Sequence, residues 1–149
     1  MDINLYIVIV FLLLILLSAF FSGTETAYFN IKSHRDDVPS KLKDLLADPR
    51  SLLVSILTGN TIINVAIGSL AAIITYRVSP DNSNLILLQV VVVSVVLIVF
   101  GEILPKTIAI RSSNKFANFV YYPLRFFIIL LYPLTFLLNG INTLVFCYL

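Results

Sequence analysis

The amino-acid sequence predicts an all-α membrane protein with three transmembrane helices, short cytoplasmic amphipathic helices and a belt-like juxtamembrane helix near the C-terminus. Of the 149 residues, 59% are hydrophobic and 12% are charged, and the mean hydropathy is +1.00. The apolar residues form long blocks, which is typical of membrane helices and not of a soluble core. We expect a single transmembrane domain, with spans at about 4–28, 51–77 and 84–110 and juxtamembrane helices at about 30–49 and 114–146.

Two further features of the composition exclude classes of protein. The single cysteine, Cys147, excludes an internal disulfide and any cysteine-based metal cluster. The net charge of +2 is too small to indicate a nucleic-acid partner. The lipid bilayer is therefore the expected environment of the chain.

The first apolar block, residues 5–21, can cross a bilayer if the helix continues through 22–27. A cleaved signal peptide is the alternative, but the block lacks a basic start and a clear cleavage site, so we favour an uncleaved span. Hydroxyls on membrane helices often bond to the carbonyl one turn earlier, which would account for a single serine. Several oxygen-bearing residues gather near the end of this helix, three of them on one face, and indicate a polar site: Ser18, Ser22 and Glu25, with Thr26 beside them.

Residues 30–50 alternate charged and apolar side chains. The segment predicts two short amphipathic helices, split near Pro39 and stopped near Pro49. The spacing of Leu42, Leu45 and Leu46 favours a helix that lies on the membrane surface or against the bundle.

The second span places two amides on one side of a helix, because Asn60 and Asn64 are four residues apart. An amide without a partner in hydrocarbon costs several kcal/mol, so both residues require partners. One interpretation is hydrogen bonding between helices, helped by small residues that allow close packing. These are Gly59, Gly68, Ala71 and Ala72. The other interpretation is a set of carbonyl-oxygen ligands for an ion.

The third span, residues 85–100, leads into the segment 101–106 (GEILPK). A lone carboxylate in hydrocarbon costs about 2.5–3.5 kcal/mol on insertion scales, so Glu102 should face a partner, a cavity or an ion. Gly101 allows close approach of the backbone and Pro105 cannot donate a hydrogen bond, so the helix should loosen here and leave carbonyls as ligands. The alternative is a helix end at which Glu102 pairs with Lys106 near the lipid headgroups.

The last stretch, residues 119–149, is apolar but interrupted by prolines and polar residues and is rich in aromatic rings. Too few apolar residues separate Arg125 from Asn139 for a straight crossing. We therefore predict a bent, belt-like helix at the membrane interface. The basic residues concentrate in 30–50 and after the third span, which predicts a multi-pass protein of the cell membrane with an external N-terminus and a cytoplasmic C-terminus.

The polar residues of the three spans supply hydroxyl, amide, carboxylate and backbone carbonyl oxygens, without His or Cys. Oxygen ligands of low total charge suit a hard cation such as Mg²⁺ or Na⁺. A single glutamate leaves bound Mg²⁺ with a net positive charge, which favours release, as a transporter requires. Three helices also cannot both surround a polar pathway and shield it from lipid, so we expect a homodimer.

Three motifs in order resemble the membrane module of the CorC/CNNM magnesium transporters: 21–27 (FSGTETA), 57–64 (LTGNTIIN) and 101–106 (GEILPK). The resemblance covers nearly the whole chain. It implies a homodimer that exports Mg²⁺ in exchange for Na⁺. It also implies an ion site formed by Ser18, Ser22, Asn60, Gly101 and Glu102. Candidates for residues that support these ligands or bind the coupling ion are Glu25, Thr26, Asn64, Pro105 and Lys106.

The chain departs from the family pattern at Thr24, which stands where the family usually has a second serine. Threonine keeps the hydroxyl. Family members continue into a cytosolic pair of CBS domains that bind adenine nucleotide, so we expect this chain to be part of a longer protein.

A membrane scaffold that senses Mg²⁺ and regulates other channels is the alternative function. An intramembrane hydrolase is not expected, because the spans lack a histidine or a pair of aspartates.

Overall fold

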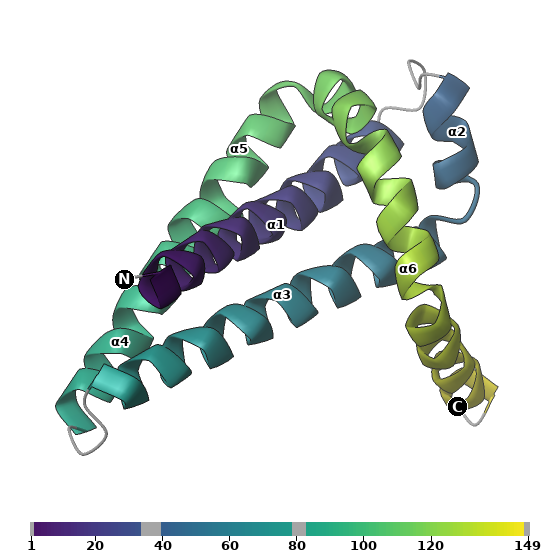
Figure 1. Ribbon diagram of the computed structural model, residues 1–149. Coiled ribbons are helices and arrows are strands. Elements are labelled where there is room, and N and C mark those ends of the chain that lie inside the picture. Colours follow the sequence, from purple (N-terminus) through teal and green to yellow (C-terminus); the bar gives the residue numbers. More distant parts are fainter. Residues whose placement is uncertain (1, 34–39, 79–82, 148–149) are drawn as a thin grey trace.

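The structure, a computed structural model, describes residues 2–33, 40–78 and 83–147. The backbone of these residues is almost entirely helical, which confirms the predicted all-α class (Figure 1). The elements are α1 (Asp2–Ser33), α2 (Ser40–Leu46), α3 (Pro49–Val78), α4 (Ser83–Val96), the π-helix η2 (Leu97–Ile103), α5 (Leu104–Arg111) and α6 (Ser113–Cys147). The segments α4, η2 and α5 follow one another without a break and contain the third predicted span.

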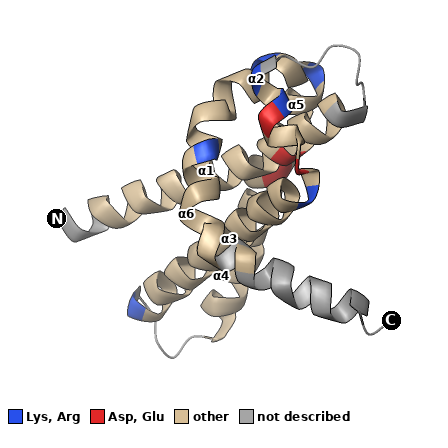
Figure 2. Cartoon of the chain, turned by 90° about the vertical axis from the view of Figure 1, so that its right-hand side faces the viewer, with Lys and Arg blue, Asp and Glu red and all other residues tan. Residues whose placement is uncertain are grey.

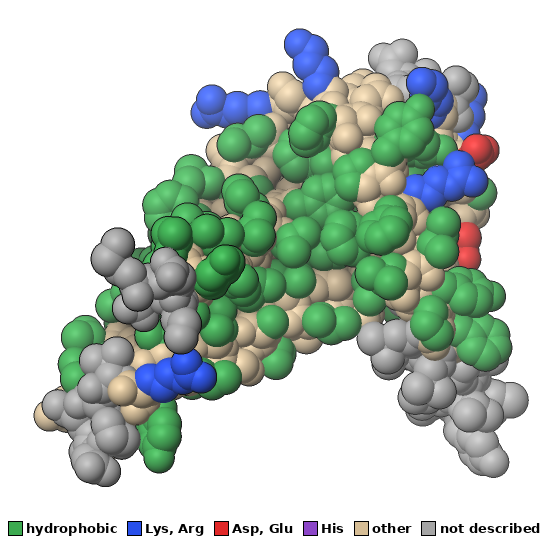
Figure 3. All heavy atoms as spheres, in the orientation of Figure 1, with side chains coloured by type: hydrophobic (Ala, Val, Ile, Leu, Met, Phe, Trp, Pro, Cys, Tyr) green, Lys and Arg blue, Asp and Glu red, His purple; other side chains and the backbone are tan. Residues whose placement is uncertain are grey.

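Among the described residues, four helical segments are long and apolar enough to cross a membrane: Leu5–Ile31, Pro49–Arg77, Ser83–Arg111 and Ser113–Pro133. Their outer surfaces carry large apolar side chains, as the space-filling view shows (Figure 3). In the most apolar window of Ser83–Arg111 only 6% of the residues are buried, so lipid must cover this hydrocarbon surface. The chain is therefore a multi-pass membrane protein.

Helix α6 is one continuous helix in the region of the predicted juxtamembrane helix at about 114–146. Both prolines, Pro123 and Pro133, lie inside it, and the helix continues through Arg125, whose guanidinium donates to the Tyr121 hydroxyl one turn earlier (3.4 Å). In Figure 1, α6 lies across the adjoining ends of α1 and α3 and contacts both. The predicted count of three spans stays a prediction, since α6 has the length and composition of a fourth.

The hydrophobic core lies at one end of the bundle, where α1, α2, α3, α5 and α6 meet. Phe21 is at its centre and packs edge-on against Phe127 of α6, with ring centroids 5.1 Å apart. The other fully buried members with large side chains are Leu42, Ile56, Val120 and Leu124. By contrast, no described residue of α4 is buried. The well-packed end therefore positions the helices, and α4 extends from it with most of its surface exposed.

Helix α2 packs against the bundle through its apolar side. Leu42 is fully buried in the core, and Leu45 and Leu46 pack against the same cluster, while Lys41 and Lys43 are exposed. These three leucines thus pack against the bundle, and the position of the helix relative to the membrane surface stays a prediction. The predicted split near Pro39 lies outside the described residues.

Pro49, near which the second short amphipathic helix is predicted to stop, is the first residue of α3. The Asp48 carboxylate accepts a hydrogen bond from the Ser51 backbone N–H (3.1 Å) and caps the new helix. A proline is well tolerated at the first helical position, where its missing N–H would have no partner in the helix. Helix α2 ends before it, at Leu46.

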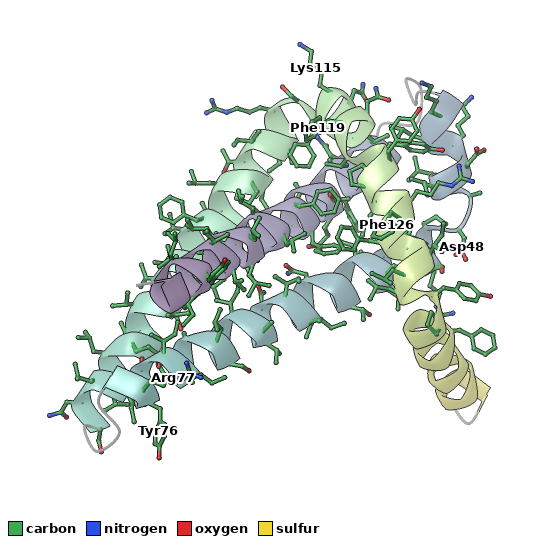
Figure 4. All side chains as sticks on the ribbon, viewed as in Figure 1. Asp48, Tyr76, Arg77, Lys115, Phe119 and Phe126 are labelled. Carbon is green, nitrogen blue, oxygen red and sulfur yellow. The ribbon has the colours of Figure 1, made fainter. Side chains whose placement is uncertain are left out.

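Charged residues gather at the core end of the bundle (Figure 2). Among the described side chains, Arg77 is the exception and lies beside Tyr76 at the far end of α3 from Asp48 (Figure 4). The predicted orientation of the chain in the membrane depends on this concentration of basic residues at one end. The cytoplasmic location of the core end stays a prediction.

Gly59 provides a test of the core packing. A Cβ atom at this position would lie 2.6 Å from two carbon atoms of the Phe21 ring, and Phe21 is held between Phe20 and Phe127. We expect Gly59→Ala to destabilise the protein by about 1–3 kcal/mol, the usual cost of overpacking. Thermal unfolding in detergent should show a lower Tm.

The matched control is Gly68→Ala on the same helix, because no atom lies within 4 Å of a Cβ atom built there. An unchanged or higher Tm is expected for this variant, since alanine favours a helix. An equal loss of Tm in both variants would contradict the proposed packing of Phe21 on Gly59.

Candidate metal centre

Ser18 and Ser22 of α1 are fully buried, although both are polar. The Ser18 hydroxyl donates to the Asn64 side-chain oxygen of α3 (2.8 Å), and its Oγ lies 3.5 Å from the side-chain oxygen of Asn60. A hydroxyl has one proton and two lone pairs, so the bond to Asn64 leaves the Ser18 lone pairs available. The structure thus brings together oxygens from two helices that the sequence had singled out separately.

The Ser22 hydroxyl is buried without a hydrogen-bond partner among the described residues. Its neighbours differ, because the Thr24 and Thr26 hydroxyls each bond to the carbonyl four residues earlier (2.6 and 3.3 Å). A buried hydroxyl that makes no bond costs free energy, and such groups commonly mark a site for water or an ion. At this end of α1 the Ser22 hydroxyl therefore lacks a partner among the described residues, as does the Tyr28 hydroxyl farther along the helix.

Gly101 brings the third span against the same cluster. A Cβ atom at Gly101 would lie 2.9 Å from Ser18 Oγ and 3.5 Å from Ser18 Cβ, so only glycine fits this contact. The residue is buried on η2, where the Leu104 N–H bonds to the Val99 carbonyl, five residues earlier. The predicted loosening of the helix at 101–106 is confirmed as a π-helix, a form often found at functional sites.

Pro105 follows the π-helix and is buried. Because it has no backbone N–H, one carbonyl of the preceding turn, at residue 100 or 101, lacks its helical donor. Glu102, three residues before Pro105, is half-buried. Its carboxylate makes no ion pair with a described residue. This turn therefore combines a carboxylate with a backbone oxygen that has no donor from the helix.

Lys106 does not pair with Glu102. Its ammonium nitrogen lies 3.7 Å from a carboxylate oxygen of Glu25 on α1, so the alternative interpretation of Glu102 and Lys106 as a pair along one helix is wrong. Glu25, Thr26 and Lys106 line an open hollow of about 470 Å³, together with Asn30. The hollow begins one turn beyond Ser22, at the core end of the bundle.

The fold brings together neutral oxygens of Ser18, Asn60 and Asn64 against Gly101, and the acid Glu102 follows Gly101 in the chain. Among the described residues, no group of three His, Cys, Asp or Glu side chains could hold a metal ion. Hydroxyl, amide and carbonyl oxygens with a single acid suit hard cations better than zinc, copper or iron.

Comparison with known proteins identifies the family. The model of the cyclin M (CNNM) transmembrane N-terminal domain matches residues 9–147. The chain belongs to the CNNM transmembrane family. The matched family is one of membrane domains and not one of enzymes.

Two curated bacterial proteins resemble this CNNM domain. The UPF0053 protein of Haemophilus influenzae is 30% identical over 139 residues, which are 88% of the chain and 33% of that protein. The UPF0053 inner membrane protein YfjD of Escherichia coli is 32% identical over 137 residues, 85% of the chain and 31% of that protein. The CNNM domain thus spans about a third of the length of these relatives.

The two amides of the CNNM domain should differ in their roles. The Asn64 oxygen accepts the Ser18 proton and orients that hydroxyl, whereas the Asn60 oxygen lies farther from Ser18 and is available to an ion. We expect Asn60→Ala to abolish Mg²⁺ flux and Asn64→Ala chiefly to lower the Tm. Liposome flux and thermal unfolding, measured on both variants, check this expectation, and the opposite pattern would exchange the two roles.

Proposed function

We propose that this chain transports Mg²⁺ through an all-oxygen site inside the membrane, and that it exports Mg²⁺ in exchange for Na⁺. The observation that carries the proposal is the contact of Ser18 with both Asn64 and Gly101, beside the buried Ser22 hydroxyl that has no described partner. The proposed ligands are Ser18, Ser22, Asn60, Gly101 and Glu102. Membership of the CNNM family and the family resemblance of the three motifs support this choice of ion.

The charge of the site supports exchange with Na⁺. Glu102 is the only acid among the proposed ligands, so bound Mg²⁺ leaves a net charge of about +1 and bound Na⁺ leaves the site neutral. Low charge favours moderate affinity for the dication and competition by the monovalent ion. Glu25, Thr26 and Lys106 line the hollow at the core end, through which an ion would reach the site.

The decisive experiment is Mg²⁺ flux into or out of liposomes that contain the purified protein. We expect flux above that of protein-free liposomes, faster with an opposing Na⁺ gradient than without it. Calorimetric titration with Mg²⁺ accompanies the assay. Binding without flux would favour the Mg²⁺-sensing scaffold, and the absence of both would contradict the proposed site.

The same function leads us to propose a homodimer with one ion site inside each subunit. Helix α4 has no buried residue in the part of the chain that the structure describes, so a large apolar surface is available for a second copy. Single cysteines placed along α3 and α4, after replacement of Cys147 by serine, should give a cross-linked dimer in native membranes. If no position gives a dimer band, the homodimer is wrong.

A further inference from the structure

An open, polar hollow of about 550 Å³ lies where α5 turns into α6, and we call it the turn hollow. Six of its seven lining residues are polar or charged: Asn30, Arg111, Ser112, Ser113, Asn114 and Lys115, with Ile31 as the apolar member. The turn hollow is distinct from the hollow at Glu25 and Lys106, although Asn30 lines both. Its polar lining is unlike the apolar outer surface of the spanning helices.

The turn hollow lies at the boundary of the membrane. Three candidate membrane spans have an end at it: Leu5–Ile31, Ser83–Arg111 and Ser113–Pro133. Next to it, large apolar side chains are exposed, namely Ile110 of α5 and Phe119 of α6. Figure 4 shows Lys115 at the outer end of α6, one turn beyond Phe119. Basic residues directly beyond apolar and aromatic ones are typical of the level of the lipid headgroups.

Two cations line the turn hollow, and no acid of the described residues does. Arg111 and Lys115 are four residues apart and exposed, and neither makes an ion pair with a described residue. Lys106, by contrast, pairs with Glu25. Like charges at one site repel each other, so an anion that binds between them is favoured.

Hydrogen bonds fix the backbone that carries these two cations. The Asn30 side-chain amide of α1 donates to the Ser113 hydroxyl (2.7 Å), which donates to the Ala109 carbonyl of α5 (2.8 Å). The Ser112 backbone N–H donates to the Ile108 carbonyl (3.2 Å). The turn is thus held against α1 and α5, and a site on a fixed backbone loses less conformational freedom on binding.

We propose that the turn hollow binds the phosphate of an anionic phospholipid, with Arg111 and Lys115 as its charged partners. A guanidinium can donate two parallel hydrogen bonds to phosphate oxygens, and an ammonium acts as a point charge. The exposed side chains of Ser112 and Asn114 offer further donors. This binding is independent of the proposed transport of Mg²⁺.

The position of the turn hollow favours a lipid over a free phosphate ion. A phospholipid places its phosphate at the level where the spans end, and its acyl chains can cover exposed residues such as Ile110 and Phe119. A zwitterionic lipid carries a cation next to its phosphate, which the two basic side chains repel. The expected partner is therefore a lipid with a net negative charge.

Native mass spectrometry of the purified full chain, titrated in detergent with single lipids, tests this site. We expect the first phosphatidylglycerol to bind at least about tenfold more tightly than the first phosphatidylcholine. Arg111→Gln/Lys115→Gln should weaken phosphatidylglycerol binding at least about tenfold, since each basic residue near an anionic lipid contributes about fivefold. Its affinity for phosphatidylcholine should not change. Both side chains are exposed, so the variant should keep its Tm in detergent without added lipid.

The matched control is Lys41→Gln/Lys43→Gln, which removes two exposed cations of α2 that do not line the turn hollow. This control should bind phosphatidylglycerol as tightly as the unmodified protein. An equal loss of affinity in both double variants would show a general attraction to basic side chains and overturn the site. Equal affinity of the unmodified protein for the two lipids would overturn it as well. Displacement of phosphatidylglycerol by an equal concentration of inorganic phosphate would make this a site for free phosphate and refute the lipid as its occupant.

Discussion

Replacing Glu102 by glutamine is expected to weaken Mg²⁺ binding by about 100-fold, equivalent to about 2.7 kcal/mol. Glutamine keeps the shape of the side chain and one carbonyl oxygen but removes the only negative charge among the proposed ligands. In the low dielectric of a membrane protein, that charge is the largest favourable term for a dication. Calorimetric titration of the purified variant with Mg²⁺ measures the effect.

The folded state should tolerate this change. Glu102 is half-buried and makes no ion pair with a described residue, so its neutral analogue leaves no partner without a bond. Circular dichroism and the Tm should therefore match those of the unmodified protein. Glu25→Gln is the informative comparison, because it removes an acid that pairs with Lys106 and lies outside the proposed ligand set. An unchanged Mg²⁺ affinity in Glu102→Gln would exclude this carboxylate from the site.

Gly101→Ala is expected to weaken Mg²⁺ binding at least about tenfold, because the new methyl group would displace a ligand. The added Cβ would lie 2.9 Å from Ser18 Oγ, closer than side-chain carbons approach such atoms. Ser18 is fully buried and bonded to Asn64, so its hydroxyl can move only by breaking that bond. Overpacking of this kind costs about 1–3 kcal/mol, which should appear as a lower Tm.

A double variant separates the steric effect from the loss of a ligand. Removing the hydroxyl in Gly101→Ala/Ser18→Ala leaves the Ser18 Cβ position 3.5 Å away, an ordinary contact. The double variant should then have the Tm of Ser18→Ala alone, which lacks the bond to Asn64 but has no overpacking, while Mg²⁺ binding should remain weak because the Ser18 ligand is lost. Gly68→Ala serves again as the control for a methyl group added to open space. Full Mg²⁺ affinity in Gly101→Ala would show that η2 does not approach the ion through Gly101.

Much of the helical framework could be predicted from the amino-acid sequence, because the cost of polar groups in hydrocarbon is a local property of each segment. The apolar blocks alone locate the helices α1 and α3 and the continuous α4–η2–α5 segment. The combination of Gly101 and Pro105 predicts the irregular turn that the structure shows as a π-helix. Membership of the CNNM family, which the three motifs suggested, is established by the match over residues 9–147.

The prolines alone do not determine where the helices begin and end. Pro49 begins a helix because Asp48 caps it, and Pro123 lies inside α6. A proline prevents one hydrogen bond, and whether a helix ends there depends on caps and on packing by distant residues. The sequence signal at Asp48, a capping residue directly before proline, was present and could have placed the start of α3.

The sequence by itself determined which residues of the membrane helices need a partner, and only the tertiary structure decided which partner each residue has. Ser18, Asn60 and Asn64 are conspicuous in apolar segments, but their hydrogen bonds depend on the rotation of α1 against α3. Lys106 contacts Glu25 on another helix and not Glu102 one turn away. A helix that is apolar on every face, such as α4, has no periodic signal to show which side is inward. The burial of the Gln89 side-chain oxygen on this helix therefore became visible only once the helices were packed together.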